Sequence, residues 1–305
     1  MKRIFLLLYT FVAVGATAQI VNNDTYSAVA FWKRGEIVRY VAETKNYDIQ
    51  NQDTTINYEG IYDVSIRVMQ RKDDFILLEW VKSNPRILTD NTNGIVPKIN
   101  IYQPTARYII RTDAAGAFIG VDNWKQVSKN NIRVAERVRK AFRKKANADA
   151  AARIADKMIA YSQTEKGIIE NELTFAKEHF CTFFGWQYQL DAKNVLKEKV
   201  DIDGDSIDTE KIIWLEEIDS VRACVEMKEM QFCNPQQTAH TAKLLFDIDS
   251  LSVIPCDNAL IMANKANIIH NSGWLLKSGM MTRLQCSEGI KEHATRLKIK
   301  TNLNR

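Results

Sequence analysis

Apolar and polar residues alternate between Tyr58 and Val68, and this pattern limits the folds open to the chain. The even positions of the stretch are apolar, aromatic or glycine, whereas the odd positions are polar apart from Ile61. Because successive side chains of a β-strand point to opposite faces, the alternation predicts a strand with one buried and one solvated face. Such a strand is typical of an antiparallel sheet.

Other segments repeat this pattern on both sides of the stretch. We expect an antiparallel meander before residue 84, and hairpins at Ala114-Ala115-Gly116, at Asp219-Ser220 and at Ser287-Glu288-Gly289. Residues 84–105 hold three of the five prolines and are expected to form a long loop. The expected strands are residues 36–45, 58–68, 75–81, 107–113, 117–121, 186–190, 211–218 and 221–232, with further strands in 251–300.

Between these β segments, residues 123–185 contain few turn signals and no alternation. Asp122 or Asn123 can serve as an N-cap, and we expect helices over 123–145, 147–162 and 165–184, the last ending at Gly185. A short helix is also expected over 235–246, because Asn234-Pro235 is typical of a helix start.

These elements predict an α+β fold, mainly an antiparallel curved sheet or half-barrel, with a helical insertion of about 60 residues. The expected organisation is a signal peptide (1–18), an N-terminal β half (19–122), the helical insertion (123–185) and a C-terminal β half (186–305) that forms one composite domain with the first.

The first helix of the insertion is strongly basic. Residues 123–145 contain nine Lys or Arg and one acid, Glu136, whereas the rest of the mature chain is net acidic. Apolar residues fall on one arc of this helix and cations on the other, which makes it amphipathic. Its stripe of like charges lacks the usual Glu–Lys pairs and suits an anionic partner, a membrane surface or the acidic β face of the same chain. The alternative is an ordinary charged outer face. The stripe is formed by Arg133, Arg137, Lys140 and Lys144.

The overall charge bears on the partner class. The chain has 42 basic and 37 acidic residues, so general nucleic-acid binding is disfavoured. Residues 1–18 have a basic start, an apolar run and Ala16-Thr17-Ala18 before Gln19, which predict a secretory signal peptide. We therefore expect an exported, periplasmic or extracellular protein with no transmembrane segment in the mature chain.

Five cysteines in an exported chain permit disulfides, but the odd number leaves at least one thiol free. We weakly favour a bridge from Cys224 or Cys233 to Cys256 or Cys286, and the alternative is five buried thiols.

No complete catalytic or metal motif is present. DIDGDSID at 201–208 has alternate aspartates, but its Gly204 and Ile212 do not fit a calcium loop, so a turn is expected. His179 and Cys181 would point apart on a helix and cannot form a dyad there. Carboxylates such as Glu216, Glu217 and Asp219 leave open a carbohydrate-active hydrolase, although acids beside a turn usually form a solvated edge. No cofactor or metal is expected.

Several short motifs support a family resemblance. The signal peptide, Phe75-x-Leu77-x-x-Trp80, Asp247-Ile-Asp249-Ser250 and Gly273-Trp274 resemble features of exported β-rich Bacteroidota proteins. In strand order and helix placement, these are similar to the periplasmic lipoprotein carriers, in which helices close a curved antiparallel sheet. The resemblance implies an apolar concave face for an acyl chain or hydrophobic peptide, with the helical insertion as a lid. It assigns no functional residue.

The leading hypothesis is a non-catalytic binding or carrier protein for an amphiphilic or hydrophobic ligand. In this hypothesis the basic helix meets the anionic head of the ligand. The alternatives are a cell-envelope structural or interaction module that docks an acidic partner, and a carbohydrate-active hydrolase. The expected wall of the ligand site is Tyr58, Tyr62, Val64, Ile66 and Val68.

Overall fold

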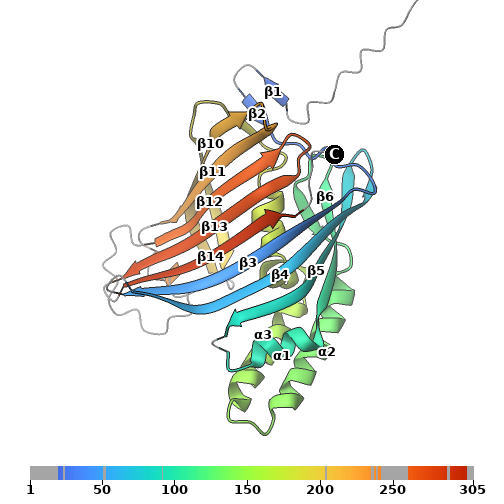
Figure 1. The fold of residues 1–305 in the computed structure, drawn as a ribbon, viewed down its shortest axis with the longest axis vertical. Helices are drawn as coiled ribbons and strands as arrows, with labels where there is room; N and C mark the ends of the chain where they lie inside the picture. Colours follow the sequence, from blue (N-terminus) through green and yellow to red (C-terminus); the bar gives the residue numbers. More distant parts are fainter. Residues whose placement is uncertain are drawn as a thin grey trace, which may run out of the picture.

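Eleven antiparallel strands form one curved sheet around a central helical segment (Figure 1). The fold is that of a computed structural model, which describes residues 20–22, 25–50, 53–90, 92–202, 205–234, 237, 240–241, 260–286 and 289–300. The strand order is β7-β6-β5-β4-β3-β14-β13-β12-β11-β10-β9, so the sheet is open, with β7 and β9 at its ends. The expected α+β class with a curved antiparallel sheet is confirmed.

Strands from before and after the helical segment share this sheet, because β3 pairs with β14 from Tyr40↔Ile299 to Ile49↔Ile290. The strands on one side of that junction are β3 (Ile37–Gln50), β4 (Asp53–Arg71), β5 (Phe75–Thr89), β6 (Thr105–Asp113) and β7 (Phe118–Val121). Those on the other side are β9 (Asn194–Ile202), β10 (Asp205–Asp219), β11 (Cys224–Cys233), β12 (Leu260–His270), β13 (Leu275–Cys286) and β14 (Gly289–Ile299).

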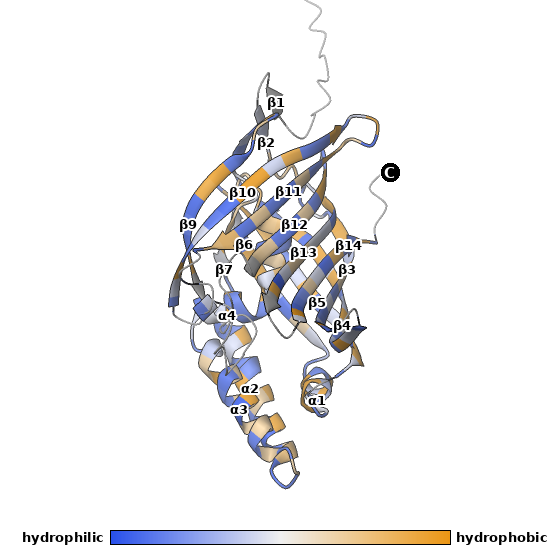
Figure 2. Cartoon of the chain, turned by 90° about the vertical axis from the view of Figure 1, so that its left-hand side faces the viewer, coloured by the Kyte–Doolittle hydropathy of each residue, from blue (hydrophilic) through white to orange (hydrophobic). Residues whose placement is uncertain are grey.

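The two faces of the sheet follow the sequence alternation. Figure 2 shows hydrophobic and hydrophilic positions alternating along the strands. In β4, Val64, Ile66 and Val68 are at most 1% exposed and belong to the main core, whereas Arg67 points away and pairs with Glu79 of β5 at 2.9 Å. Burial of one face therefore fixes the strand register.

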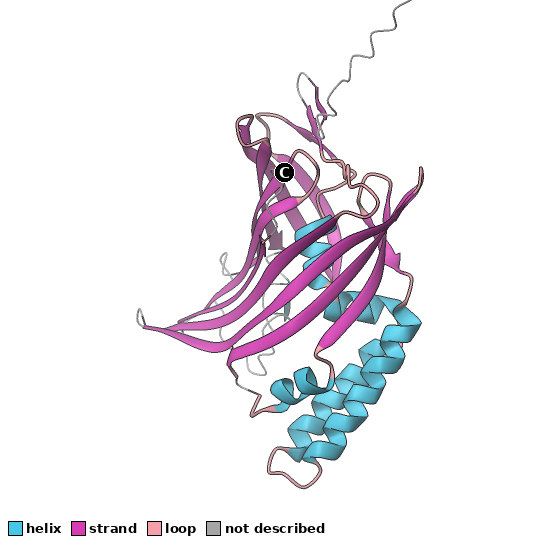
Figure 3. Cartoon of the chain, turned by 45° about the vertical axis from the view of Figure 1, so that its right-hand side comes forward, coloured by secondary structure: helices cyan, strands magenta, loops and turns pink. Residues whose placement is uncertain are grey.

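The helices gather at one end of the sheet and inside its curve (Figure 3). Helices α2 and α3 form an antiparallel pair with a small apolar core of their own, to which α1 adds Ile95. Helix α4 and the π-helix η1 lead from this pair into the concave face. The helices are α1 (Ile95–Tyr102), α2 (Trp124–Phe142), α3 (Ala148–Ser162), α4 (Glu165–Glu172) and η1 (Phe175–Cys181).

Aromatic side chains fill the concave face where η1 enters it. Phe180 of η1 is fully buried and stacks on Trp32 with ring centroids 5.1 Å apart. Trp274 also lies 5.1 Å from Trp32, and its indole donates a hydrogen bond to Glu36 at 3.0 Å. Arg71 holds the Trp32 segment by donating to the carbonyl of Trp32 at 3.1 Å. This part of the concave face is therefore packed by the protein's own side chains.

A separate three-stranded sheet lies beside the main one, and the sequence did not suggest its first two strands. Tyr26 in this sheet is fully buried and its ring lies 6.3 Å from that of Tyr188, so it extends the core. Its strands are β1 (Ile20–Asn22), β2 (Thr25–Ser27) and β8 (Gln187–Gln189).

Three local predictions were wrong. The expected loop over 84–105 is the end of β5 followed by α1, because Pro97 occupies the first helical turn, where a missing N–H removes no hydrogen bond. The expected helix over 165–184 is divided at Leu173 into α4 and η1. The Asp219-Ser220 hairpin has a longer turn, since β11 begins only at Cys224. Most of the helix expected over 235–246 lies outside the described residues.

Candidate functional site

A pocket of 360 Å³ lies on the concave side of β3, β4 and β5, beside α1 and the end of α4. It begins where the aromatic core ends, because Tyr62 lines the pocket and also packs edge-on against Phe175 of η1 at 5.4 Å. We call this space the concave pocket. Its apolar and aromatic surface comes from Tyr58, Ile61, Tyr62, Ile87 and Ile99, and none of its lining residues is acidic.

Lys82 brings a positive charge to the wall of the concave pocket. It follows Ile76, Leu78 and Trp80 on the buried face of β5, so its side chain continues that alternation into the interior. Burial lowers the pKa of Lys82 to about 8, and the charge of Glu172 opposes this shift.

The ammonium group of Lys82 has few polar partners. Its Nζ lies 5.5 Å from the ring centroids of Tyr62 and Tyr108, and it donates a hydrogen bond to the main-chain carbonyl of Glu172. Within the described part of the chain, Lys82 forms no ion pair. Two aromatic faces and one carbonyl therefore hold a cation that keeps hydrogen-bonding capacity to spare.

Glu172 connects the sheet to the helices behind the concave pocket. Its carboxylate accepts hydrogen bonds from the Tyr108 hydroxyl of β6 and from the Asn131 amide of α2. Asn131 is fully buried and also donates to Ser162 of α3 at 3.1 Å. Burial raises the pKa of Tyr108, and the Glu172 charge raises it further. This network fixes the helices relative to the pocket wall.

A second hollow, the α2 groove, has a volume of 630 Å³ and lies between β6 and α2. Strand β7 pairs only with the Ile110–Thr112 part of β6, which leaves the preceding edge of β6 open to α2. The Asn123 side chain takes the place of a strand there, accepting from the Ile109 N–H at 2.8 Å and donating to the Arg107 carbonyl at 3.1 Å. The groove shares three lining residues, Gln103, Pro104 and Ala106, with the concave pocket.

The predicted basic stripe lies on the exposed side of α2. Arg133, Arg137, Lys140 and Lys144 are all exposed, and among the described residues none of them forms an ion pair. Arg133 and Arg137 line the α2 groove together with Arg107, and no acidic residue is among its lining residues. The structure therefore does not place these four cations against an acidic face of the same chain.

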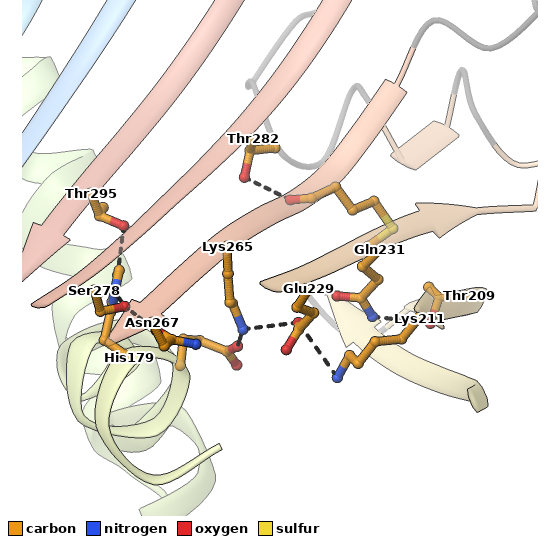
Figure 4. Close-up of polar contacts among 12 residues, drawn as sticks. His179, Thr209, Lys211, Glu229, Gln231, Lys265, Asn267, Ser278, Thr282 and Thr295 are labelled. Carbon is orange, nitrogen blue, oxygen red and sulfur yellow. Dashed lines mark hydrogen bonds and ion pairs between the residues drawn. The ribbon is translucent and has the colours of Figure 1, made fainter. Parts of the chain in front are cut away.

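A buried polar layer lies next to the aromatic core, at the side of η1 that faces β10 to β13 (Figure 4). Lys265 of β12 is 1% exposed, and its Nζ lies 2.8 Å from Glu178 of η1 and 3.2 Å from Glu229 of β11. Burial would raise the pKa of Glu178, but the charge and hydrogen bond of Lys265, together with the charges of Lys177 and Lys211, outweigh it and lower that pKa to about 2. The same two carboxylates raise the pKa of Lys265 despite its burial. We expect Lys265 and Glu178 to remain charged at neutral pH.

His179 connects η1 to the opposite strands through two hydroxyl groups. Its Nδ1 lies 2.6 Å from Ser278 Oγ, and its Nε2 lies 2.7 Å from Thr295 Oγ1. Ser278 donates to Asn267 Oδ1 at 2.5 Å, so it accepts from the Nδ1–H of His179, and Nε2 accepts from Thr295. Burial and the Lys265 charge lower the pKa of His179 to about 3. His179 is thus a neutral residue that joins η1 to β13 and β14, and both of its ring nitrogens are hydrogen-bonded to hydroxyl groups and not to Cys181.

The structure divides the five residues of the predicted ligand wall. Tyr58 and Tyr62 line the concave pocket, and burial raises the pKa of both hydroxyl groups. Val64, Ile66 and Val68 lie further along β4 on the same face, inside the packed core. The wall predicted from alternation is therefore one continuous face, of which only the Tyr58 end borders open space.

Two of the predicted disulfide partners, Cys224 and Cys286, lie far apart among the described residues. Cys181 and Cys224 are buried free thiols. Cys224 is paired in register with His270 at one end of the sheet, whereas Cys286 ends β13 at the other, about eleven residues or ~36 Å along the strand direction. A Cys224–Cys286 bridge is therefore excluded. Cys256 lies outside the described residues.

The acidic sequence motifs have structural roles where they are described. Glu216 accepts a hydrogen bond from the Trp214 indole at 2.8 Å and pairs with Lys228 at 3.1 Å, and Asp219 pairs with Arg222 at 3.4 Å. Part of the 201–208 turn lies outside the described residues. In the described part of the chain, no three His, Cys, Asp or Glu side chains are grouped as a metal site, and no helix has the length and apolarity to cross a membrane.

Lys82, Gln103 and Glu172 were missed in the sequence. A signal for Lys82 was present, because it continues the buried alternation of Ile76, Leu78 and Trp80 with a charge. No comparable signal marks Gln103 or Glu172, whose positions depend on how α1 and α4 pack against the sheet.

Comparisons with known proteins give only distant matches. No protein-family model matches the chain, and no curated protein matches it. A lipovitellin structure concerned with lipid–protein interactions matches at a TM-score of 0.37 and 10% identity, over 88% of this chain and 25% of that chain. A DUF1329 family protein from Desulfovibrio piger matches at a TM-score of 0.15 and 9% identity, over 88% of both chains. The COG4313 outer membrane channel from Pseudomonas putida F1 matches at a TM-score of 0.16 and 6% identity, over 89% of this chain and 97% of that chain. We base no functional argument on likenesses this low.

Proposed function

We propose that the protein is a non-catalytic exported binding or carrier protein for an amphiphilic or hydrophobic ligand. The observation that carries this proposal is the concave pocket, whose 360 Å³ are bordered by two tyrosines and three isoleucines. This volume falls within the range of about 300–1,000 Å³ that is typical of small-ligand pockets. The predicted signal peptide supports export.

The pocket is suited to binding and not to chemistry on the ligand. Tyr58 and Tyr62 have raised pKa values, which disfavour their ionisation, and the carboxylate of Glu172, whose charge acts on Lys82, is engaged by Tyr108 and Asn131. A wall of aromatic and aliphatic groups with one cation offers affinity and orientation.

A matched pair of substitutions tests this proposal. Ile87→Trp would place an indole in the concave pocket, whereas Leu88→Trp adds the same group at a neighbouring position of β5 that is 59% exposed. We expect organic extraction and mass spectrometry of the purified wild type and of Leu88→Trp to release a bound amphiphile. Ile87→Trp should release much less.

Added decanol, a neutral amphiphile, provides the second measurement. Calorimetry should show decanol binding to the wild type and to Leu88→Trp, and weak or no binding to Ile87→Trp. The proposed function would be overturned if the wild type released no co-purified amphiphile and also bound neither decanol nor its carboxylate counterpart, decanoate.

The exposed cations of α2 support a second candidate, an envelope module that contacts an anionic partner or membrane surface. Four cations without an ion pair on one side of a helix form a field that favours anions. This contact is compatible with ligand binding, because none of the four cations lines the concave pocket. No feature of the described residues favours the hydrolase alternative.

A further inference from the structure

The charged residues that line the concave pocket and the adjoining α2 groove are all basic. Lys82 and Arg86 line it, Arg107, Arg133 and Arg137 line the adjoining α2 groove, and neither set of lining residues contains an Asp or Glu. The whole chain, by contrast, has nearly balanced charge. A concentration of cations beside an apolar cavity favours a ligand that is both apolar and negatively charged.

Lys82, which is partly buried, differs from the fully buried Lys265 in its partners. Lys265 is neutralised by Glu178 at 2.8 Å and Glu229 at 3.2 Å, which is the usual arrangement for a buried ammonium group. Among the described residues, Lys82 contacts a carbonyl and two aromatic faces, and the Glu172 carboxylate, whose charge acts on Lys82, accepts hydrogen bonds from Tyr108 and Asn131 instead. An ammonium group has three donors, so Lys82 can still donate to an acceptor inside the pocket that it lines.

We infer that the concave pocket binds a monoanionic amphiphile of the fatty-acid class. The ligand carboxylate accepts hydrogen bonds from Lys82, and its alkyl chain lies against Tyr58, Ile61, Ile87 and Ile99. This inference rests on the proposed function and specifies the ligand of the same pocket.

The charge and the volume of the pocket both favour a carboxylate with a chain of medium length. One ammonium group neutralises a monoanion, whereas a phosphate monoester would bring a second charge into an apolar space at a large desolvation penalty. At the ~30 Å³ of a water-sized group, 360 Å³ holds about twelve non-hydrogen atoms, which is the size of decanoate.

The test compares decanoate with decanol, which has the same chain and no charge. Both are titrated by calorimetry at neutral pH into the wild-type protein, Lys82→Met and Lys277→Met. The methionine keeps the length of Lys82 and removes its charge, and Lys277→Met removes an exposed cation of β13 that lines neither the concave pocket nor the α2 groove. The thermal unfolding temperature of each variant establishes that it is folded.

We expect the wild type and Lys277→Met to bind decanoate about tenfold or more tightly than decanol, because the coupling energies measured for close charge pairs at a protein interface correspond to about that factor or more. Lys82→Met should bind both ligands with similar affinity. Equal binding of decanoate and decanol to the wild type would overturn the inference and leave the proposed function standing. An unchanged preference for decanoate in folded Lys82→Met would also overturn it. Failure of both ligands to bind the wild type would overturn the inference, and the absence of a co-purified amphiphile as well would overturn the proposed function with it.

Discussion

Replacement of Lys265 by methionine removes the central charge of the buried polar layer. Lys265 is 1% exposed and lies between Glu178 and Glu229, so the substitution leaves two carboxylates without their cation. Removing one member of a buried ion pair typically costs about 3–5 kcal/mol. The pKa of Glu178 gives a comparable figure, because lowering it from 4.5 to about 2 corresponds to at most about 3 kcal/mol.

The expected loss depends on pH in a defined direction. In the wild type, Glu178 has a folded-state pKa below its unfolded value, so its stabilisation is present above about pH 4.5 and is lost as the pH falls towards 2. Without Lys265, burial raises the pKa of Glu178 instead, and the variant gains stability when that carboxylate is protonated. The difference between the two proteins should therefore be largest near neutral pH and should shrink towards about pH 4.

Urea unfolding followed by tryptophan fluorescence measures this difference, since Trp32 and Trp274 pack on Phe180 of η1. Lys277→Met is the matched control, because Lys277 lies on β13 with an exposed side chain and should change the free energy of unfolding by about 0.5 kcal/mol or less. A Lys265→Met protein within about 1 kcal/mol of the wild type at neutral pH would refute the reasoning. So would a loss that is the same at acidic and neutral pH.

Three further predictions concern the pocket, its network and the basic helix. Burial lowers the pKa of Lys82 from 10.5 to about 8, so the unfolded chain binds more protons than the folded protein between these pH values. The free energy of unfolding of the wild type, relative to that of Lys82→Met, should therefore rise by up to about 2–3 kcal/mol between pH 8 and pH 10. Urea midpoints across this range test the prediction, and a difference that does not change with pH would contradict it. Asn131→Ala removes a buried amide that joins Glu172 to Ser162 and should reduce the free energy of unfolding by about 1–3 kcal/mol, whereas the exposed Asn130→Ala should have little effect. Replacing the four stripe cations, Arg133, Arg137, Lys140 and Lys144, by Glu should abolish sedimentation of the protein with anionic vesicles. The melting temperature should stay within a few degrees of the wild type, because the four side chains are exposed. Unchanged sedimentation would show that the stripe is only a solvated face.

The alternation between Tyr58 and Val68 was sufficient to predict which face of β4 is buried. Its limits were local: the sheet extends the strand from Asp53 to Arg71, because pairing with β3 and β5 stabilises flanking residues that lack the pattern. The helices of residues 123–172 were predictable for a related reason, since their apolar positions recur at helical spacing and pack as expected.

The concave pocket could be anticipated only in part. Tyr58 and Tyr62 were expected on its wall, but alternation cannot show where a packed core ends and open space begins. That boundary is set by Phe175 of η1, more than a hundred residues later in the chain. Lys82 carried a local signal, whereas the partnership of Glu172 with Tyr108 depends on tertiary packing alone.

The position of η1 determines what kind of ligand the curved sheet can hold. Phe180 and its aromatic neighbours occupy the part of the concave face that a long acyl chain would need, and Glu178 and His179 connect η1 to β11, β12, β13 and β14 across the sheet. Displacing η1 would expose this aromatic surface and separate the Glu178–Lys265 ion pair, so both effects oppose it. The space left beside Tyr62 is short and ends near a cation. A ligand of the proposed kind would therefore have to be compact, because a long chain threaded through the sheet would require the displacement of η1.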